Sequence, residues 1–226
     1  MAPIKATQVS SPKEALMRLQ QGNKRFVQGM ISVESMLGIQ KLRELAEGGQ
    51  SPYAIVVCCS DSRVPVETVF DCGLGELFVI RVAGNIISSS VIASIEFAAS
   101  SFNPQICVVM GHTRCGAITA ALNAESGTQT ETYSPDLERL LSEIRPSARN
   151  VINTNPGADI ERLKEKTTLL NIANSVNALR EQSPFLREMH QSGRMMITGA
   201  LCDLVSGEVN LVDSEERPRL LSRVVG

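Results

Sequence analysis

Two short polar clusters, each directly after an apolar run, constrain this chain more than any other feature of its sequence. Residues 59–63 read CSDSR and follow the apolar run 53–58. Residues 111–116 read GHTRCG and follow the apolar run 106–110. Both runs have the length and composition of buried strands, and a helical pattern follows each cluster. Because the turns after parallel strands meet at one edge of an open α/β sheet, we expect the two clusters to form one site.

The side chains of these clusters are typical of a metal site. Cys59 and Asp61 have C-x-D spacing, and His112 and Cys115 have H-x-x-C spacing. Two thiolates and one imidazole suit zinc, with one Zn²⁺ per chain. Asp61 as a fourth ligand would close a tetrahedron, and its release would open one position to water. Each residue alone also fits a structural role, but their combination after two buried strands favours a metal.

The same clusters carry a resemblance to the β-class carbonic anhydrases. The order CSDSR and then GHxxCG is specific to that family, and the resemblance covers most of the chain. The matching segments are 15–26 (ALMRLQQGNKRF), 50–52, 59–65 (CSDSRVP), 73–85 (GLGELFVIRVAGN), 94–96, 111–117 and 199–209. The resemblance implies a zinc lyase that interconverts CO2 and bicarbonate, in which zinc-bound hydroxide attacks CO2.

The resemblance also implies roles for the residues of the two clusters. Cys59, His112 and Cys115 would hold the zinc, with Asp61 or water as the fourth ligand. Arg63 would hold Asp61 away from the metal, since a guanidinium can clamp a carboxylate with two hydrogen bonds. Asp61 would then orient the attacking hydroxide.

Five further residues are expected in the substrate pocket: Gln50, Phe78 and Ala83, which match pocket positions of the family, together with Phe97 and Gly116. Gln50 would donate its amide to a substrate oxygen, and Gly116 would offer a backbone N–H. Phe78 and Ala83 would line an apolar pocket that suits CO2. Phe97 is a departure, because many relatives carry a tyrosine there and a phenyl ring cannot relay a proton.

A second departure concerns closure of the site. One branch of the family closes at lower pH, with bicarbonate held nearby by a tryptophan, an arginine and a tyrosine. The matching positions here are Val56, Arg81 and Cys202, so only the arginine remains. A ligand shifts a conformational equilibrium only by its differential affinity, so we expect bicarbonate to have little effect here. Asp61 should be paired with Arg63 near neutral pH.

The alternation of apolar runs and helical patterns predicts the fold class. We expect an α/β fold with a central, mostly parallel β-sheet flanked by helices, and an antiparallel C-terminal edge strand. The predicted strands are 53–58, 77–82, 106–110, 195–204 and 208–212. The predicted helices are 12–28, 39–47, 64–71, 87–101, 115–124, 137–150 and 159–181. The polar stretch 187–193 places His190, the only histidine outside the two clusters, at a solvated helix end.

No internal repeat or linker divides the sequence, so we expect one carbonic anhydrase domain over residues 1–226. A helical arm would occupy 1–48 and an α/β core 53–226. Residues 11–14 (SPKE) form a capping box that starts the arm's first helix. Such arms wrap a partner subunit in the family, which implies a dimer or a tetramer. The alternative is a helix that packs on its own core.

Composition narrows the other partners. The net charge is −2 with no basic stripe, so neither nucleic acid nor an anionic membrane is an expected partner. No apolar run approaches the ~20 residues that span a bilayer, and the first residues lack the apolar segment of a signal peptide. We therefore expect a cytoplasmic protein. In that reducing compartment Cys58, Cys72, Cys107 and Cys202 are expected as free, mostly buried thiols, with a disulfide as the alternative.

Two other functions fit the same residues. The scaffold could hydrolyse CS2 or COS, because such relatives differ mainly in access to the pocket. The chain could also be a zinc-bearing structural or bicarbonate-sensing subunit with little turnover. The presence of Asp61, Arg63 and Gln50 together favours catalysis.

Overall fold

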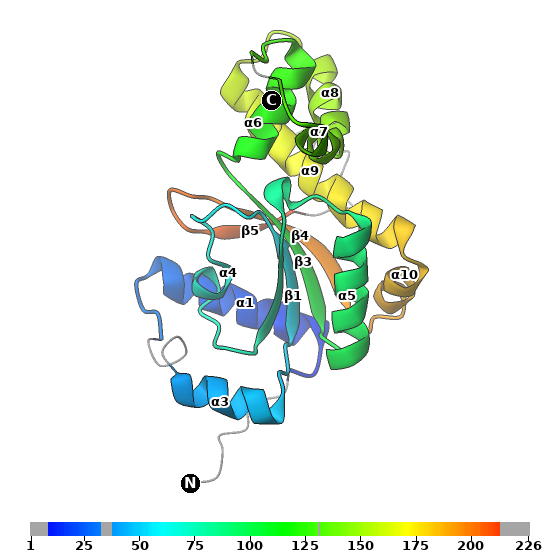
Figure 1. Cartoon of the computed structure of the whole chain (residues 1–226). Helices are drawn as coiled ribbons and strands as arrows, with labels where there is room; N and C mark the ends of the chain where they lie inside the picture. The colour runs from blue at the N-terminus through cyan, green and yellow to red at the C-terminus, as the bar shows by residue number, and fades with distance from the viewer. Residues whose placement is uncertain (1–8, 33–37, 131, 213–226) are drawn as a thin grey trace.

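The five strands form one sheet in the order β2-β1-β3-β4-β5 (Figure 1). The computed structural model describes residues 9–32, 38–130 and 132–212. The strands are β1 Ala54–Cys58, β2 Leu77–Arg81, β3 Ile106–His112, β4 Met196–Cys202 and β5 Val209–Val212. The first four are parallel to their neighbours, and β5 runs antiparallel to β4 at one edge. The predicted fold class is confirmed.

Helices cover both faces of the sheet. The helices are α1 Pro12–Val27, α3 Ile39–Gly48, α4 Val66–Val69, α5 Ser89–Phe102, α6 Gly116–Ser126, α7 Pro135–Ser142, α8 Arg145–Thr154, α9 Ile160–Gln182 and α10 Pro184–Gln191, with a 3-10 turn η1 at Ala83–Asn85. Helices α1 and α4 pack on one face, and α5, α9 and α10 pack on the other. Helices α6 to α8 gather at one end of the sheet, and α3 lies at the other end (Figure 1).

Strand β1 shows why this sheet is buried on both faces. All five of its residues are buried, as expected of a parallel strand covered by helices on both sides. Val56 and Cys58 belong to the core cluster under α1, whereas Ile55 and Val57 belong to the cluster under α5 and α9. Because side chains alternate along a strand, Cys58 points away from the next residue in the chain, Cys59.

Helix α1 packs on the sheet of its own chain. The Ser11 hydroxyl accepts a hydrogen bond from the Glu14 N–H, and Pro12 begins the helix, as predicted. The other half of the capping box differs, because the Glu14 carboxylate accepts from Ser10 and not from the Ser11 N–H. Its buried residues Ala15 and Leu19 join the core cluster under the sheet. Helix α3 differs, because none of its described residues is buried and Leu42 is 52% exposed.

Two helix predictions are wrong. The predicted helix 137–150 is two helices, α7 and α8, because Pro146 in the first turn of α8 has no N–H for a continuous helix. The polar stretch around His190 belongs to α10, which Ser183 caps. His190 is half-buried, and its Nδ1 accepts the Ile197 N–H at 3.2 Å, so it is not a solvated helix end.

All six cysteines are free and buried, so the prediction of free thiols at positions 58, 72, 107 and 202 is confirmed. Burial raises the pKa of Cys58 and Cys107 to about 12, and that of Cys72 and Cys202 to about 11. These four thiols therefore stay protonated near neutral pH. Within the described residues, no helix has the length and apolar character needed to cross a bilayer.

Candidate metal centre

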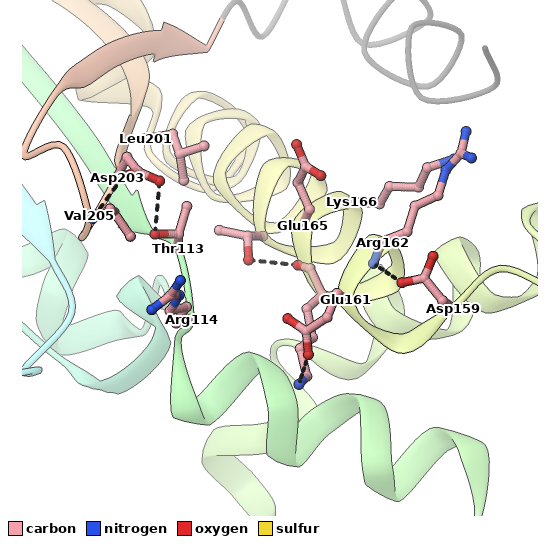
Figure 2. Close-up of a pocket in the computed structure, with 12 residues that line it drawn as sticks. Thr113, Arg114, Asp159, Glu161, Arg162, Glu165, Lys166, Leu201, Asp203 and Val205 are labelled. Carbon is pink, nitrogen blue, oxygen red and sulfur yellow. Dashed lines mark hydrogen bonds and ion pairs between the residues drawn. The ribbon is translucent and has the colours of Figure 1, made fainter.

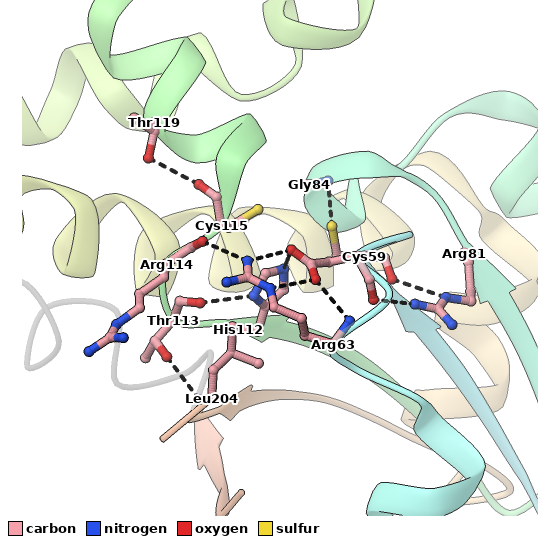
Figure 3. Close-up of polar contacts among 11 residues, drawn as sticks. Cys59, Arg63, Arg81, Gly84, His112, Thr113, Arg114, Cys115, Thr119 and Leu204 are labelled. Carbon is pink, nitrogen blue, oxygen red and sulfur yellow. Dashed lines mark hydrogen bonds and ion pairs between the residues drawn. The ribbon is translucent and has the colours of Figure 1, made fainter. Parts of the chain in front are cut away.

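The register of two neighbouring strands brings the two clusters together. Cys58 in β1 lies opposite Met110 in β3, so Cys59 comes beside the end of β3, where His112 lies. Cys115 follows after a short turn and is the N-cap residue of α6. The ligand atoms of Cys59, His112 and Cys115 all lie within 4.8 Å of one another, and all three side chains are buried (Figure 3).

His112 is oriented as a metal ligand. Its Nδ1 lies 2.9 Å from the Thr113 carbonyl, so Nδ1 carries the proton and donates it. Its Nε2 is buried without a hydrogen-bond partner among the described residues. An orphaned buried nitrogen beside two sulfur atoms is the arrangement that a tetrahedral Zn²⁺ site needs. The donor set therefore fits the metal that the sequence predicts.

The two candidate thiolates differ from the four core thiols. A hydrogen bond from Cys115, with further contributions from His112 and the Gly84 N–H, lowers the pKa of Cys59. The pKa of Cys115 is raised in turn, because the proton shared by two adjacent sulfur atoms stays on Cys115. The amides at a helix N-terminus ordinarily lower the pKa of a thiol, and those of α6 act in that direction here but do not outweigh the effect of Cys59. A bound cation would take the place of that proton.

Arg63 holds Asp61 beside the candidate metal ligands. The guanidinium donates to both carboxylate oxygens, from Nε to Oδ1 at 2.8 Å and from Nη2 to Oδ2 at 2.6 Å. The Arg63 backbone N–H donates to Oδ1 as well. These hydrogen bonds hold the pKa of Asp61 well below its usual range, so Asp61 stays ionised. Its Oδ2 lies 3.9 Å from Nε2 of His112, at the side of the site.

Two arginine contacts fix the loop that carries Cys59 and Asp61. Nη2 of Arg63 also donates to the Arg114 carbonyl at 3.2 Å, which joins the two clusters (Figure 3). Arg81 donates to the Cys59 carbonyl at 3.1 Å and to the Asp61 carbonyl at 2.6 Å. The sequence assigned Arg81 only to a lost bicarbonate pocket, and the structure shows that its guanidinium contacts the backbone of this loop.

The expected pocket residues separate into two groups. Ala83 in η1 and Gly116 at the start of α6 lie in the segments that contact the metal ligands, and an added Cβ at Gly116 would meet no atom within 4 Å. Gln50 is exposed and precedes β1, at the end opposite Cys59. Phe78 pairs with Ile55, also at that end of the strand. Within one chain, neither Gln50 nor Phe78 reaches the site.

Phe97 belongs to an aromatic group on the edge of the sheet. It is 58% exposed on α5, and its ring centroid lies 6.4 Å from that of Phe78 and 6.1 Å from that of Phe102. Strand β2, which carries Phe78, is the edge strand. This aromatic group therefore lies at the β2 edge of the sheet, away from the candidate metal ligands of its own chain.

Gly84 also contacts the site, and its sequence pattern alone was not used to predict this. Its N–H donates to Sγ of Cys59 at 3.4 Å. Gly84 and Asn85 both have positive φ angles, +69° and +45°. The Gly-Asn pair after the predicted strand 77–82 could have indicated this left-handed turn.

Replacing Gly84 with alanine should destabilise the protein. The left-handed backbone disfavours a Cβ by roughly 1–2 kcal/mol, and that atom would also lie 2.5 Å from Cδ1 of Ile144. Gly127 is a matched control, because its φ is +71° and an added Cβ would meet nothing within 4 Å. We expect urea unfolding to show a larger loss of stability for Gly84→Ala than for Gly127→Ala. Equal losses would show that the contact with Ile144 has no effect.

A cavity of about 680 Å³ adjoins the turn between His112 and Cys115 (Figure 2). Thr113 and Arg114 line it together with the first turns of α9. Its described walls carry both signs of charge, from lysine and arginine as well as aspartate and glutamate, and none of the three candidate ligands is among them. The metal site and this cavity are therefore separate features.

The chain is a mostly parallel α/β protein with two cysteines and one histidine at the carboxyl edge of its sheet, where this fold class places its ligand sites, and these three side chains could hold a metal ion. Comparison with known proteins identifies the family. Residues 54–209 match the family model described as carbonic anhydrase. The chain is 34% identical to carbonic anhydrase 2 of Mycobacterium tuberculosis over 206 residues, which cover 90% of this chain and 94% of that protein. It is 33% identical to the carbonic anhydrase of Mycolicibacterium smegmatis over 202 residues, with 89% and 94% covered.

Solved structures agree with the sequence comparisons. The β-carbonic anhydrase CcaA superimposes with a TM-score of 0.70 at 27% identity, covering 89% of this chain and 96% of that chain. CafA, a β-carbonic anhydrase of Aspergillus fumigatus, gives 0.68 at 26% identity, with 82% and 88% covered. The chain belongs to the β-class carbonic anhydrases, as its sequence motifs predict.

Proposed function

We propose that this chain catalyses the reversible hydration of CO2 to bicarbonate and a proton with one Zn²⁺. The observation that carries the proposal is the meeting of three buried donors, Cys59, His112 and Cys115, beside the Asp61–Arg63 pair. Zinc held by these three side chains would polarise a water molecule and make it a better nucleophile. Two thiolates balance the charge of the ion, and the Thr113 carbonyl fixes the tautomer of His112.

Asp61 and Arg63 orient the reaction. An ionised carboxylate only accepts hydrogen bonds, so Asp61 can accept one from the attacking oxygen and direct its lone pair at CO2. Arg63 holds both carboxylate oxygens, which keeps Asp61 off the metal and in one orientation. Gly116, at the exposed start of α6, is placed to offer its backbone N–H to a substrate oxygen. Ala83 would add an apolar surface for CO2 beside Gly116.

A second copy of the chain completes the proposed pocket. Gln50, Phe78 and Phe97 lie away from the candidate metal ligands of their own chain. The aromatic group flanks β2, which among the described residues pairs with a strand on one side only. A partner across that edge could bring these residues to the site, so we propose a dimer or a tetramer. A matched chain at 24% identity comes from a study of two β-carbonic anhydrases of Sordaria macrospora that are described as tetrameric. The proposed cytoplasmic location is supported by the six free cysteines.

The two thiolates lead us to expect an alkaline activity profile. They place two negative charges on the ion, so it acidifies water less than it does in a site of three neutral imidazoles, where the pKa is about 7. Protonation of Asp61 does not explain a loss of activity at low pH. Its pKa is lowered, so the carboxylate is ionised at every pH above its normal value. The rate of CO2 hydration should still rise above pH 7. A rate already constant below pH 7 contradicts this expectation.

Stopped-flow CO2 hydration on purified protein with quantified zinc tests the proposed function. We expect one zinc per chain and turnover that disappears with chelation and returns with Zn²⁺. Full zinc loading without CO2 hydration would contradict the proposal. In that case, turnover of CS2 or COS by the same sample would indicate a hydrolase, and its absence a structural or sensing subunit.

A further inference from the structure

The hydrogen bond from Gly84 to Cys59 depends on a turn that helix α9 holds in place. We infer that Asn171, in the middle of α9, is a positioning residue for the metal ligand Cys59; the inference rests on the metal site of the proposed function. Asn171 is 3% exposed, and its Nδ2 donates to the Gly84 carbonyl at 2.9 Å. The N–H of the same glycine donates to Sγ of Cys59 at 3.4 Å. Gly84 is therefore held on both sides: Cys59 accepts from its N–H, and Asn171 donates to its carbonyl.

Ser175 makes a parallel contact one turn further along α9. It is 6% exposed, and its hydroxyl donates to the Asn85 carbonyl at 3.4 Å. Residues four apart lie on the same face of a helix. Helix α9 therefore presents two buried donors, Asn171 and Ser175, to two successive carbonyls of η1.

The turn requires such support because its backbone is unfavourable. Gly84 and Asn85 both have positive φ, and a left-handed conformation persists only where the surroundings impose it. Ile144 and Ala117 close the turn on another side, since a Cβ at Gly84 would lie 2.5 Å and 3.2 Å from their side chains. The peptide group between Gly84 and Asn85 is held at both ends. Its N–H, that of Asn85, donates to the Val82 carbonyl at 3.0 Å, and its carbonyl, that of Gly84, accepts the hydrogen bond from Asn171.

A fixed N–H beside a thiolate affects how that sulfur binds a metal. The N–H stabilises the charge on Cys59 and sets the direction in which its remaining lone pairs point. Partners of metal ligands change metal affinity by about 10–100-fold when they are removed. We therefore expect loss of the Asn171 amide to weaken metal binding by about 10-fold or more, although Asn171 does not itself contact the metal ligands.

The test uses Asn171→Leu, which keeps the side-chain volume but removes the donor, and Asn171→Asp, which keeps the shape. Asn174→Leu is the matched control. It changes the same residue type one turn along the same helix, where the Asn174 side chain donates to the Ser147 hydroxyl at 2.9 Å. Two quantities are measured on folded full-length protein: the rate of zinc release to excess chelator, and the thiolate-to-metal absorption band after substitution with Co²⁺.

Both Asn171 variants should release zinc at least about 10-fold faster than wild type and shift the Co²⁺ band, whereas Asn174→Leu should stay within about 2-fold and leave the band unchanged. A purely structural role would lower the unfolding temperature without changing the zinc-release rate or the Co²⁺ band, and that result would overturn the inference.

If the Asn171 variants do not fold, Ser175→Ala is measured. Several-fold faster release supports the inference, and release at the wild-type rate overturns it. Wild-type protein that binds neither metal would overturn the proposed function as well, so the two failures are distinguishable.

Discussion

The Cys59→Ser variant should lose both its zinc and its CO2 hydration activity, whereas Cys58→Ser should keep both. The two thiols are neighbours in sequence but belong to different clusters of the core. Cys58 lies under α1, where burial raises its pKa to about 12. The pKa of Cys59 is lowered by Cys115, and its sulfur lies within 4.8 Å of the other two ligand atoms. Serine in place of Cys59 replaces a soft thiolate with a hydroxyl that is a poor ligand for zinc.

Zinc content by atomic emission and stopped-flow CO2 hydration measure this pair of variants. We expect less than about a tenth of the wild-type zinc in Cys59→Ser, because removing even a hydrogen-bond partner of a metal ligand lowers metal affinity about 10–100-fold, and Cys59 is itself a proposed ligand. Cys58→Ser is the control for Cys59→Ser. It makes the same chemical change at the neighbouring position, where the serine hydroxyl lies in the apolar core. The reverse pattern, with zinc retained in Cys59→Ser, would show that the ligand set has been assigned to the wrong thiol.

The Arg63→Ala variant should retain zinc but lose most of its turnover. Without the guanidinium, no other described side chain donates two hydrogen bonds to the Asp61 carboxylate. A released carboxylate beside a divalent cation becomes its fourth ligand and fills the position that substrate water needs. We expect kcat to fall by about 100-fold or more, the size of effect that follows loss of a positioned acid–base group. The Arg63 side chain is 53% exposed, so its removal should affect folding little.

Two measurements distinguish this closure from a general defect. X-ray absorption at the zinc edge should show one more oxygen from a carboxylate in Arg63→Ala than in wild type. Arg139→Ala is the control, because Arg139 is also exposed and pairs with Asp136 at 2.9 Å, in α7. Unchanged turnover in Arg63→Ala would refute the role of this arginine in keeping the site open.

The sequence was sufficient where a local pattern decides the structure. Runs of apolar residues as long as a strand predicted β1 and β3, and the carboxyl ends of two parallel strands then had to bring Cys59 near His112. Ser11 predicted the start of α1 because a helix cap is also a local pattern: Ser11 and its partner Glu14 are three residues apart.

The sequence was insufficient where distant contacts decide the structure. Asn171 and Gly84 are 87 positions apart, so no local pattern connects them. The pKa of Cys115 depends more on the sulfur of Cys59 than on the amides of its own helix, and the sequence does not show that the two sulfur atoms are adjacent. The helical periodicity over 137–150 concealed the break at Pro146, because the apolar positions of α7 and α8 continue one another closely enough to resemble one helix.

The register between β1 and β3 links the site to the thermodynamics of folding. Cys59 and His112 reach each other only because Cys58 lies opposite Met110. An unfolded chain leaves these residues apart, so zinc at the proposed site would bind the native state almost exclusively and would stabilise it by mass action, by about 2.7 kcal/mol at a free concentration 100 times the dissociation constant. The unfolding midpoint should therefore follow the free zinc concentration. For this enzyme, the measured stability is a property of the protein and its metal supply together.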